Sequence, residues 1–454
     1  IGAVLSQRVK AASDFLIAGR KLGLLLTMVS LAAVQLGAGV ILGGSELGAE
    51  NGIWPGMWYG IGCGGGLILA GLLVAGKMRS HGGYVPLDFF AKRYGDKKWV
   101  RIWGWLSNIP SLLGIFIAQI MAAGSIFSVF GFSYTQGVLI VGFVIMLYSV
   151  MGGMWGVVIT DLIQLAIIVI GIPMVAVISF VQIGNQGSIS SIFMTDFIPP
   201  GMLSKAVFII VPFLLSISVS YDAFMRYQSA KSADTAKWGC IWGGVIVIII
   251  SFCAGLIGAA GRVLFPEVDN NIILPHMVQT MLSPVLAGFL VSALLAAAMS
   301  SANSLLISLS GCFTRDLYNK VFNPSIKLND LKHSKTISRV VIVIGVFVGM
   351  IIAFKMEGIL YTIIIFNYPY MGSLLVPLLG GVLWKKATFK GAAAAMAVGG
   401  IIGVVSFAAG IPGRFYGLFN IDLGLLIAYV SSAAVFITVS KITAEGNRDF
   451  NGSE

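Results

Sequence analysis

Long apolar runs separated by short polar or basic segments dominate this chain. A helix that crosses a membrane needs about 20 mostly apolar residues, and the pattern predicts twelve complete spans. They cover residues 23–49, 52–77, 101–129, 133–151, 154–184, 204–224, 236–261, 274–312, 337–355, 358–383, 388–410 and 421–440. Residues 1–8 are typical of the last turns of a further, truncated N-terminal helix. The pattern therefore predicts an all-α membrane protein.

Composition supports this class. The chain is 57% hydrophobic and only 10% charged, whereas a soluble domain carries about 25% charged residues. All four cysteines lie in apolar runs and the three histidines are scattered along the chain. We therefore expect the cysteines to be core residues, and we expect neither a disulfide framework nor a His-based metal site. The cysteines are Cys63, Cys240, Cys253 and Cys312, and the histidines are His81, His276 and His333.

The basic residues predict how the chain is oriented. If residues 8–21 are cytoplasmic, alternation of the spans places 25 of the 29 Lys and Arg residues on the same side. The loops on the other side keep only Lys205, Arg262, Lys355 and Arg414. This asymmetry follows the positive-inside rule, and it explains the net charge of +11 without a nucleic-acid partner. We expect a multi-pass protein of the cell membrane, with the basic loops and the C-terminus in the cytoplasm.

Two of the predicted spans carry helix-breaking residues near their centres. The first span contains Gly37 and Gly39, and the sixth contains Pro212 followed by a polar stretch from Ser216 to Asp222. Unwound backbone is tolerated at membrane depth only where it lines a cavity or is buried in protein, and its carbonyls can then bind ions. Gly and Pro are also simply frequent in membrane helices. The pairing of the first and sixth spans favours an inverted repeat of five helices.

A polar face on span eight predicts an ion site. Topology places Ser300 and Ser301 at the same depth as the segment before the break in span one. Backbone carbonyls of Ala33, Leu36 and Ala297, together with the hydroxyls of Ser300 and Ser301, would supply five uncharged oxygen ligands. Oxygen ligands suit hard cations, and the lack of charge favours sodium. The alternative is that these hydroxyls bond to their own helix or join neighbouring helices.

An acidic residue inside the fifth predicted span is a second candidate site, because charge within the membrane is costly and usually functional. Asp161 could bind a second cation together with Ser300, Asn303 or Ser304, or it could carry a proton. Alternatively, it caps the start of a helix or pairs with a basic loop residue. Glu46 and Asp222 lie near span ends, and we expect both to be interfacial or, for Glu46, part of an outer vestibule.

Four motifs resemble those of the sodium/solute symporter family, which includes transporters for sugars, proline, pantothenate, sialic acid and choline. They are ASDFLIAGR at 12–20, MGGMWGVVITDLIQ at 151–164, RYQSAKSADTAK at 226–237, and MSSANS at 299–304 with TRDLY at 314–318. The resemblance covers residues 12–330 in motifs and the whole chain in its pattern of spans. It implies that sodium binds at the site described above, and that some members hold a second sodium where Asp161, Ser300, Asn303 and Ser304 lie.

The resemblance also implies a LeuT-type fold, with two inverted five-helix repeats and additional C-terminal helices. The expected divisions are a helix end and cytoplasmic loop at 1–21, the first repeat at 22–185, an extracellular loop at 186–203, the second repeat at 204–383, and two further spans with a short cytoplasmic tail at 384–454.

This resemblance implies that the substrate is a small organic solute. The first two spans and span eight are most similar to the choline-transporter branch. Gln35 and Ser220 replace aromatic residues of its cage, and Gly39 and Val40 replace the Glu and Gln of sugar transporters. An amino-acid-like compound, a carboxylate or a quaternary amine remains. The expected contacts are Gln35, Gln119, Ser218, Ser220, Tyr221 and Tyr361.

We therefore predict a sodium-coupled secondary active symporter that imports this solute by alternating access, as a monomer or homodimer in the lipid bilayer. A membrane sensor or channel on the same fold is one alternative, and a proton-coupled symporter that uses Asp161 is another. No nucleophile–base pair, zinc motif or pair of acids indicates an enzyme.

Overall fold

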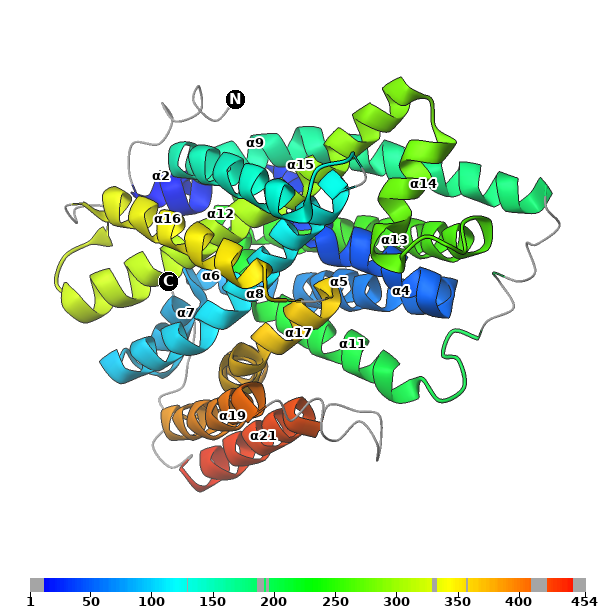
Figure 1. Cartoon of the computed structure of the whole chain (residues 1–454). Helices are drawn as coiled ribbons and strands as arrows, with labels where there is room; N and C mark the ends of the chain where they lie inside the picture. The colour runs from blue at the N-terminus through cyan, green and yellow to red at the C-terminus, as the bar shows by residue number, and fades with distance from the viewer. Residues whose placement is uncertain are drawn as a thin grey trace.

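The computed structural model describes residues 12–128, 130–185, 192, 196–328, 333–356, 358–409 and 423–443. These residues form helices joined by short loops (Figure 1). Within them, a single isolated bridge between Leu22 and Ala230 represents β structure. The truncated helix expected at residues 1–8 lies outside the described residues.

The first half of the chain contains the first interrupted helix. Its elements are α2 (Ala12–Ile17), η2 (Ala18–Arg20), α3 (Leu24–Gln35), η3 (Gly39–Gly43), α4 (Gly44–Asn51), α5 (Ile53–Leu73), α6 (Ala75–His81), α7 (Pro86–Tyr94), α8 (Lys98–Ser128) and α9 (Tyr134–Asn185). Helix α9 covers both the fourth and the fifth expected spans, whose apolar parts are Tyr134–Leu147 and Val158–Asn185.

The second half contains the second interrupted helix. Its elements are α11 (Leu203–Ser216), η4 (Ile217–Val219), α12 (Tyr221–Ser229), α13 (Ala233–Leu264), η5 (Asn270–Ile272), α14 (Ile273–Met281), α15 (Pro284–Cys312), η6 (Phe313–Phe322), α16 (Ser334–Ala353), α17 (Ile359–Tyr370), η8 (Met371–Leu375), α18 (Val376–Leu383), α19 (Phe389–Ala409) and α21 (Leu423–Ile442). In the described part of the chain, eight helices are long and apolar enough to cross a membrane, or up to ten if each bent pair is one span.

The eighth expected span begins later than predicted. The sequence suggested one helix over 274–312, but the structure separates α14 from α15 at Leu282 and Ser283, which are both extended (ψ 155° and 150°). Proline disfavours a helical conformation in the residue before it, and Pro284 is well suited to start a new helix. The polar face from Ser300 to Ser304 therefore lies on a helix of its own.

Both interrupted helices are bent where the sequence indicated. Helix α3 meets the segment Gly39–Asn51 at 54°, and the segment Leu203–Val219 meets α12 at 40°. Leu36 leaves the helical region with ψ 36°, and Ser220 is extended with ψ 152°. The second break therefore lies at Ser220, and Pro212 is inside α11.

Close helix packing surrounds these breaks. Helix α13 packs along α5, α4 and α3, while α15 packs against α9 and α8. A Cβ on Gly64 of α5 would lie 2.6 Å from the carbonyl oxygen of Gly244 on α13, so these two backbones approach as closely as small residues allow. Figure 1 shows α19 and α21 side by side at the lower edge of the view, where they pack against each other. The two breaks thus lie in the core, which positions the candidate site.

Candidate ion and substrate site

The break after α3 frees backbone carbonyls that a continuous helix would use. The amide of Ala38 would normally donate to the carbonyl of Val34, but it donates to Oε1 of Gln119 at 2.8 Å. Gly37 is required here, because a Cβ at this position would lie 2.6 Å from Oε1 of Gln119 and 2.7 Å from Oγ of Ser301. Gln119 of α8 therefore holds the interruption open from one side.

Ser301 of α15 meets these free carbonyls. Its hydroxyl lies 3.1 Å from the carbonyl oxygen of Ala33 and 3.2 Å from that of Val34. Leu36 is the residue directly after α3, and Ala297 lies one helical turn before Ser301 on α15. Ala33, Leu36, Ala297 and Ser301 are all buried. The structure therefore brings the unwound first helix and the serine face of α15 to one place.

Asp161 of α9 adjoins this place from a third helix. Its carboxylate accepts hydrogen bonds from Ser300 and from Ser30, the latter at 3.0 Å. Asp161 is fully buried in the interior of α9, so it does not cap the start of a helix. Oδ1 of Asn303 and Oγ of Ser304 are also buried, and neither has a hydrogen-bond partner in the part of the chain that the structure describes.

The structure corrects the placement of two charged residues. We expected Asp222 at the membrane interface, and Arg226 lies beyond the end of the sixth predicted span, but both are buried in α12, with exposed fractions of 5% and 0%. Nε of Arg226 donates to the carbonyl and hydroxyl oxygens of Ser30, each at 3.0 Å. Because Ser30 in turn donates to Asp161, Arg226 and Asp161 belong to one buried polar cluster.

A small cavity of about 30 Å³ lies between the two breaks. This is room for roughly two water molecules. Four of the predicted substrate residues line it, namely Gln35, Gln119, Ser220 and Tyr221. The others lie elsewhere: Oγ of Ser218 donates back to the carbonyl of Leu215 at 2.6 Å, and Tyr361 is 53% exposed in a separate cavity.

That separate cavity has a volume of about 210 Å³ and is lined by Tyr361, Glu46, Glu50 and Lys205, among others. A neighbouring cavity of about 540 Å³ is lined by Glu46 and Asp269. Glu46 thus lies in a vestibule, as one of our two expectations for it proposed.

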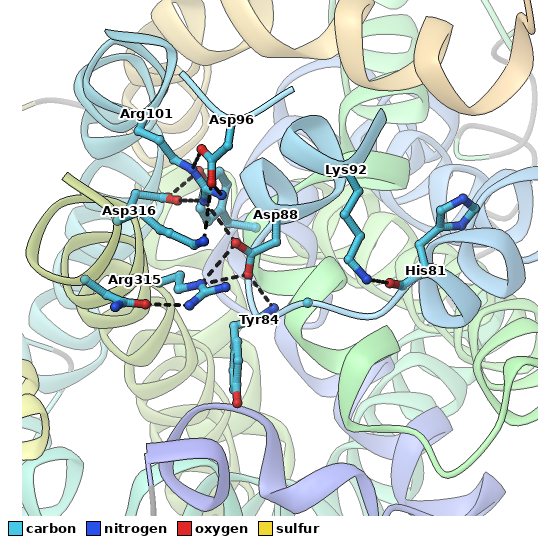
Figure 2. Close-up of polar contacts among 12 residues, drawn as sticks. His81, Tyr84, Asp88, Lys92, Asp96, Arg101, Arg315 and Asp316 are labelled. Atoms are coloured by element: carbon cyan, nitrogen blue, oxygen red, sulfur yellow. Dashed lines mark hydrogen bonds and ion pairs between the residues drawn. The ribbon is translucent and has the colours of Figure 1, made fainter. Parts of the chain in front are cut away.

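Figure 2 shows a buried ion-pair network that the sequence did not reveal. Arg101 of α8 lies 2.7 Å from Asp316 of η6, 3.0 Å from Asp88 of α7 and 2.9 Å from Asp96. The hydroxyl of Tyr221, which lines the cavity, donates to Asp316 at 2.9 Å. The network therefore connects α7, the start of α8 and η6 to the cavity wall.

Arg315 completes this network, with Nε 3.0 Å from Asp88. Burial by itself would raise the pKa of Asp88, but the guanidinium groups of Arg315 and Arg101 more than offset that effect and lower its pKa to about 2. Asp88 therefore stays ionised at neutral pH and holds two arginines together.

Comparisons with known proteins identify relatives of this chain. A model of the sodium:solute symporter family matches residues 15–399. A sodium/proline symporter of Staphylococcus aureus is 25% identical over 461 aligned residues, which cover 95% of this chain and 88% of that protein.

Solved structures show the fold. A Na+-coupled sialic acid symporter in its substrate-bound outward-open state has a TM-score of 0.74 at 19% identity, covering 97% of this chain and 94% of the other. A nucleobase-cation-symport-1 family transporter, closed around bromovinylhydantoin, has a TM-score of 0.61 at 16% identity, covering 94% and 95%. Both are LeuT-fold transporters, and this chain shares that fold. Because the family model spans most of its length, the chain belongs to the sodium:solute symporter family.

Proposed function

We propose that this chain imports a small organic solute together with sodium by alternating access between two sides of the membrane. The family to which it belongs is sodium-coupled. The observation that carries the proposal is the contact between the Ser301 hydroxyl and the carbonyls of Ala33 and Val34 at the break of α3. This contact joins a helix of the first half to a helix of the second through oxygen atoms alone.

Sodium binds where those oxygens meet. The hydroxyl of Ser301 now donates to two carbonyls, and by rotating it presents its lone pairs to a cation instead. The carbonyls of Ala33, Leu36 and Ala297 and the hydroxyl of Ser300 complete a set of uncharged ligands that suits a monovalent hard cation. The buried oxygens of Asp161, Asn303 and Ser304 form the place for a second sodium or a proton.

The central cavity receives the solute. It is far smaller than a pocket for an organic ligand, which measures about 300–1,000 Å³, so binding requires the surrounding helices to separate. The break at Ser220 makes α12 the element that can move, because this one extended residue separates it from η4, which continues α11. Gln35, Gln119, Ser220 and Tyr221 are the proposed contacts, while Tyr361 belongs to the outer vestibule.

The Arg101 network closes the cavity toward the basic side, which we propose is cytoplasmic. Release to that side requires Tyr221 to separate from Asp316 and α8 to separate from η6. The driving force for one sodium includes about 2.3 kcal/mol for each 100 mV of membrane potential, before any concentration gradient.

Uptake by purified protein in liposomes tests this proposal. Labelled proline, small carboxylates and quaternary amines are supplied with an inward sodium gradient, with potassium in its place, or with an inward proton gradient. We expect uptake of at least one solute with sodium, abolished by a sodium ionophore. Uptake that depends on the proton gradient and not on sodium would mean that a proton, bound at Asp161, is the coupling ion. Conduction of the solute without accumulation would indicate a channel.

A further inference from the structure

We propose that the central cavity selects solutes that carry a positively charged nitrogen, with the carboxylate of Asp222 as their anchor. This inference rests on the proposed function, since it takes the central cavity to be the substrate site. It names the class of substrate, which neither the family nor its relatives determine for this chain.

Asp222 is the one charged residue among the described residues that line the cavity. Among the described residues that line the cavity, none is Lys, Arg or His. In the same part of the chain, no basic nitrogen lies within ion-pair distance of its carboxylate. Its one recorded side-chain partner is Nε2 of Gln35, at a long 3.4 Å from Oδ2. A buried carboxylate without a counter-ion is unfavourable, and a bound cation removes that cost.

Arg226 attracts this carboxylate but forms no direct ion pair with it in the part of the chain that the structure describes. Its Nη1 donates to the backbone carbonyl of Asp222 at 3.0 Å, and its Nε donates to Ser30. Through Ser30 the guanidinium group joins the side chain of Asp161. The buried region therefore contains two acids and one base, and Asp222 is the acid that faces the cavity.

Four aromatic rings line the same cavity as two edge-to-face pairs. The ring centroids of Tyr59 and Phe213 are 4.7 Å apart at 72°, and those of Tyr221 and Tyr370 are 6.4 Å apart at 74°. The hydroxyl of Tyr370 is fixed on the carbonyl of Val219 at 2.7 Å. Aromatic faces attract ammonium groups, so the rings and the carboxylate favour the same ligand chemistry. These four rings stand at positions other than Gln35 and Ser220, which are the positions where the choline-transporter branch has aromatic residues.

The outer vestibule carries the matching charge. Among the described residues that line its two cavities, the acids Glu50 and Asp269 outnumber the one base, Lys205. An excess of negative charge at the mouth of a pocket raises the local concentration of cations. An anion without an amine would meet repulsion both there and at Asp222.

The remaining polar groups of the cavity suit the other end of the solute. Asn108 and Ser111 come from α8 and Asn367 comes from α17, and Oγ of Ser111 donates to Oδ1 of Asn367 at 2.6 Å. These uncharged amides and hydroxyls of the protein can bind either a hydroxyl or a carboxylate of the solute, and they do not require one in preference to the other. The class is therefore defined by its nitrogen and includes both amino alcohols and amino acids.

The test compares matched compounds with and without the charged nitrogen. Thermal stabilisation of the purified protein in sodium is measured for choline against 3,3-dimethylbutan-1-ol, for proline against tetrahydrofuran-2-carboxylate, and for a wider set of amines and carboxylates. Compounds that stabilise the protein are then tested for uptake. We expect only compounds with a positive nitrogen to bind. The proposal is overturned if no ammonium compound binds. It is also overturned if a neutral or anionic isostere binds.

Variants separate the anchor from the rest of the site. Asp222→Asn should weaken binding of the ammonium compounds roughly tenfold or more, and Asp222→Glu should retain part of it. Glu267→Gln, an exposed acid outside these cavities, is the matched control and should bind as wild type. If Asp222→Asn changes only the sodium dependence of uptake and leaves the discrimination between charged and neutral isosteres intact, Asp222 is an ion ligand and the proposal fails. Sodium-driven uptake of an anionic solute refutes this inference alone, whereas no sodium-driven uptake of any solute refutes the proposed function.

Discussion

Replacing Arg101 with methionine should open the basic side of the protein. Arg101 is 2% exposed and contacts Asp88, Asp96 and Asp316. Methionine retains much of the volume of the side chain but none of its charge. In the variant Asp88 still has Arg315, whereas Asp316 loses its basic partner and keeps the hydroxyl of Tyr221 and the neighbouring thiol of Cys312. The cost is therefore concentrated on a fully buried carboxylate.

The size of the expected effect follows from the burial of the Asp316 carboxylate. Removing one partner of a buried ion pair costs about 3–5 kcal/mol. If the network forms only while the basic side is closed, the same energy shifts the balance between closed and open states by roughly two to three and a half orders of magnitude. Lys320→Ala is the matched control, since its pair with Asp96 at 3.3 Å is 27% and 38% exposed, and such pairs contribute about 0–1 kcal/mol.

Cys312 provides the assay. It is fully buried at the end of α15, and its sulfur lies 3.5 Å from Nδ2 of Asn108, which lines the cavity. With the other three cysteines replaced by alanine, the rate of Cys312 alkylation by a small maleimide reports opening on this side. We expect Arg101→Met to react at least about tenfold faster than wild type, and Lys320→Ala to react at the wild-type rate.

The outcome that refutes the reasoning is a folded Arg101→Met protein whose Cys312 reacts at the wild-type rate. Asp316→Asn guards against loss of folding, because it removes one charge and keeps the shape of the side chain. It should change the rate of alkylation in the same direction by a smaller factor. A variant that only lowers the unfolding temperature, without faster alkylation, would make the network structural and not a gate.

Three further predictions follow from individual contacts. Gly37→Ala should raise the sodium concentration for half-maximal uptake roughly 5–150-fold, because its Cβ would overlap Gln119 and Ser301; an unchanged value would contradict the geometry of the break. Asp161→Asn should keep the bond from Ser30 but weaken sodium dependence, measured as the Hill coefficient and midpoint of uptake, if a second ion binds there. Because the folded-state pKa of Asp88 is about 2, below its ordinary 3.8, Asp88 stabilises the protein above about pH 4 and loses that contribution as the pH falls toward 2. The Asp88→Asn protein should therefore lose less thermal stability than the wild-type protein when the pH is lowered. Equal losses of thermal stability in the two proteins would refute the ion pairing.

The break in the first helix was predictable because its cause is local. Gly37 and Gly39 weaken a helix wherever they occur, and a polar pair such as Ser300 and Ser301 needs a reason to lie in an apolar run. Helical periodicity and the alternation of spans then bring these segments to one depth. The structure places Ser301 against Ala33, as that reasoning predicts.

The charged residues after the second break were misplaced for a physical reason. Asp222 and Arg226 follow an apolar run and precede a basic loop, so the sequence suggests a membrane interface. The extended residue Ser220 instead starts a new buried helix, and its hydroxyl accepts from the amide of Ala223 at 3.4 Å. Serine is a favoured N-cap residue and an acid is favoured in the first turn of a helix, so Ser220 followed by Asp222 was a helix-start signal available in the sequence.

The network around Arg101 was beyond reach of the sequence. Asp316 lies 215 positions away from Arg101, and nothing local to either residue indicates the other. Only the packing of η6 against α8 brings them together, and that packing depends on the whole fold.

Equilibrium binding of radioactive sodium to the purified protein tests the central claim most directly. Ser301→Ala removes the hydroxyl that contacts α3, while Ser310→Ala on the same helix removes one that only bonds back to Ile307. We predict saturable sodium binding by wild type and by Ser310→Ala, and affinity reduced roughly tenfold or more in Ser301→Ala. Wild-type affinity in a folded Ser301→Ala protein would show that sodium binds elsewhere.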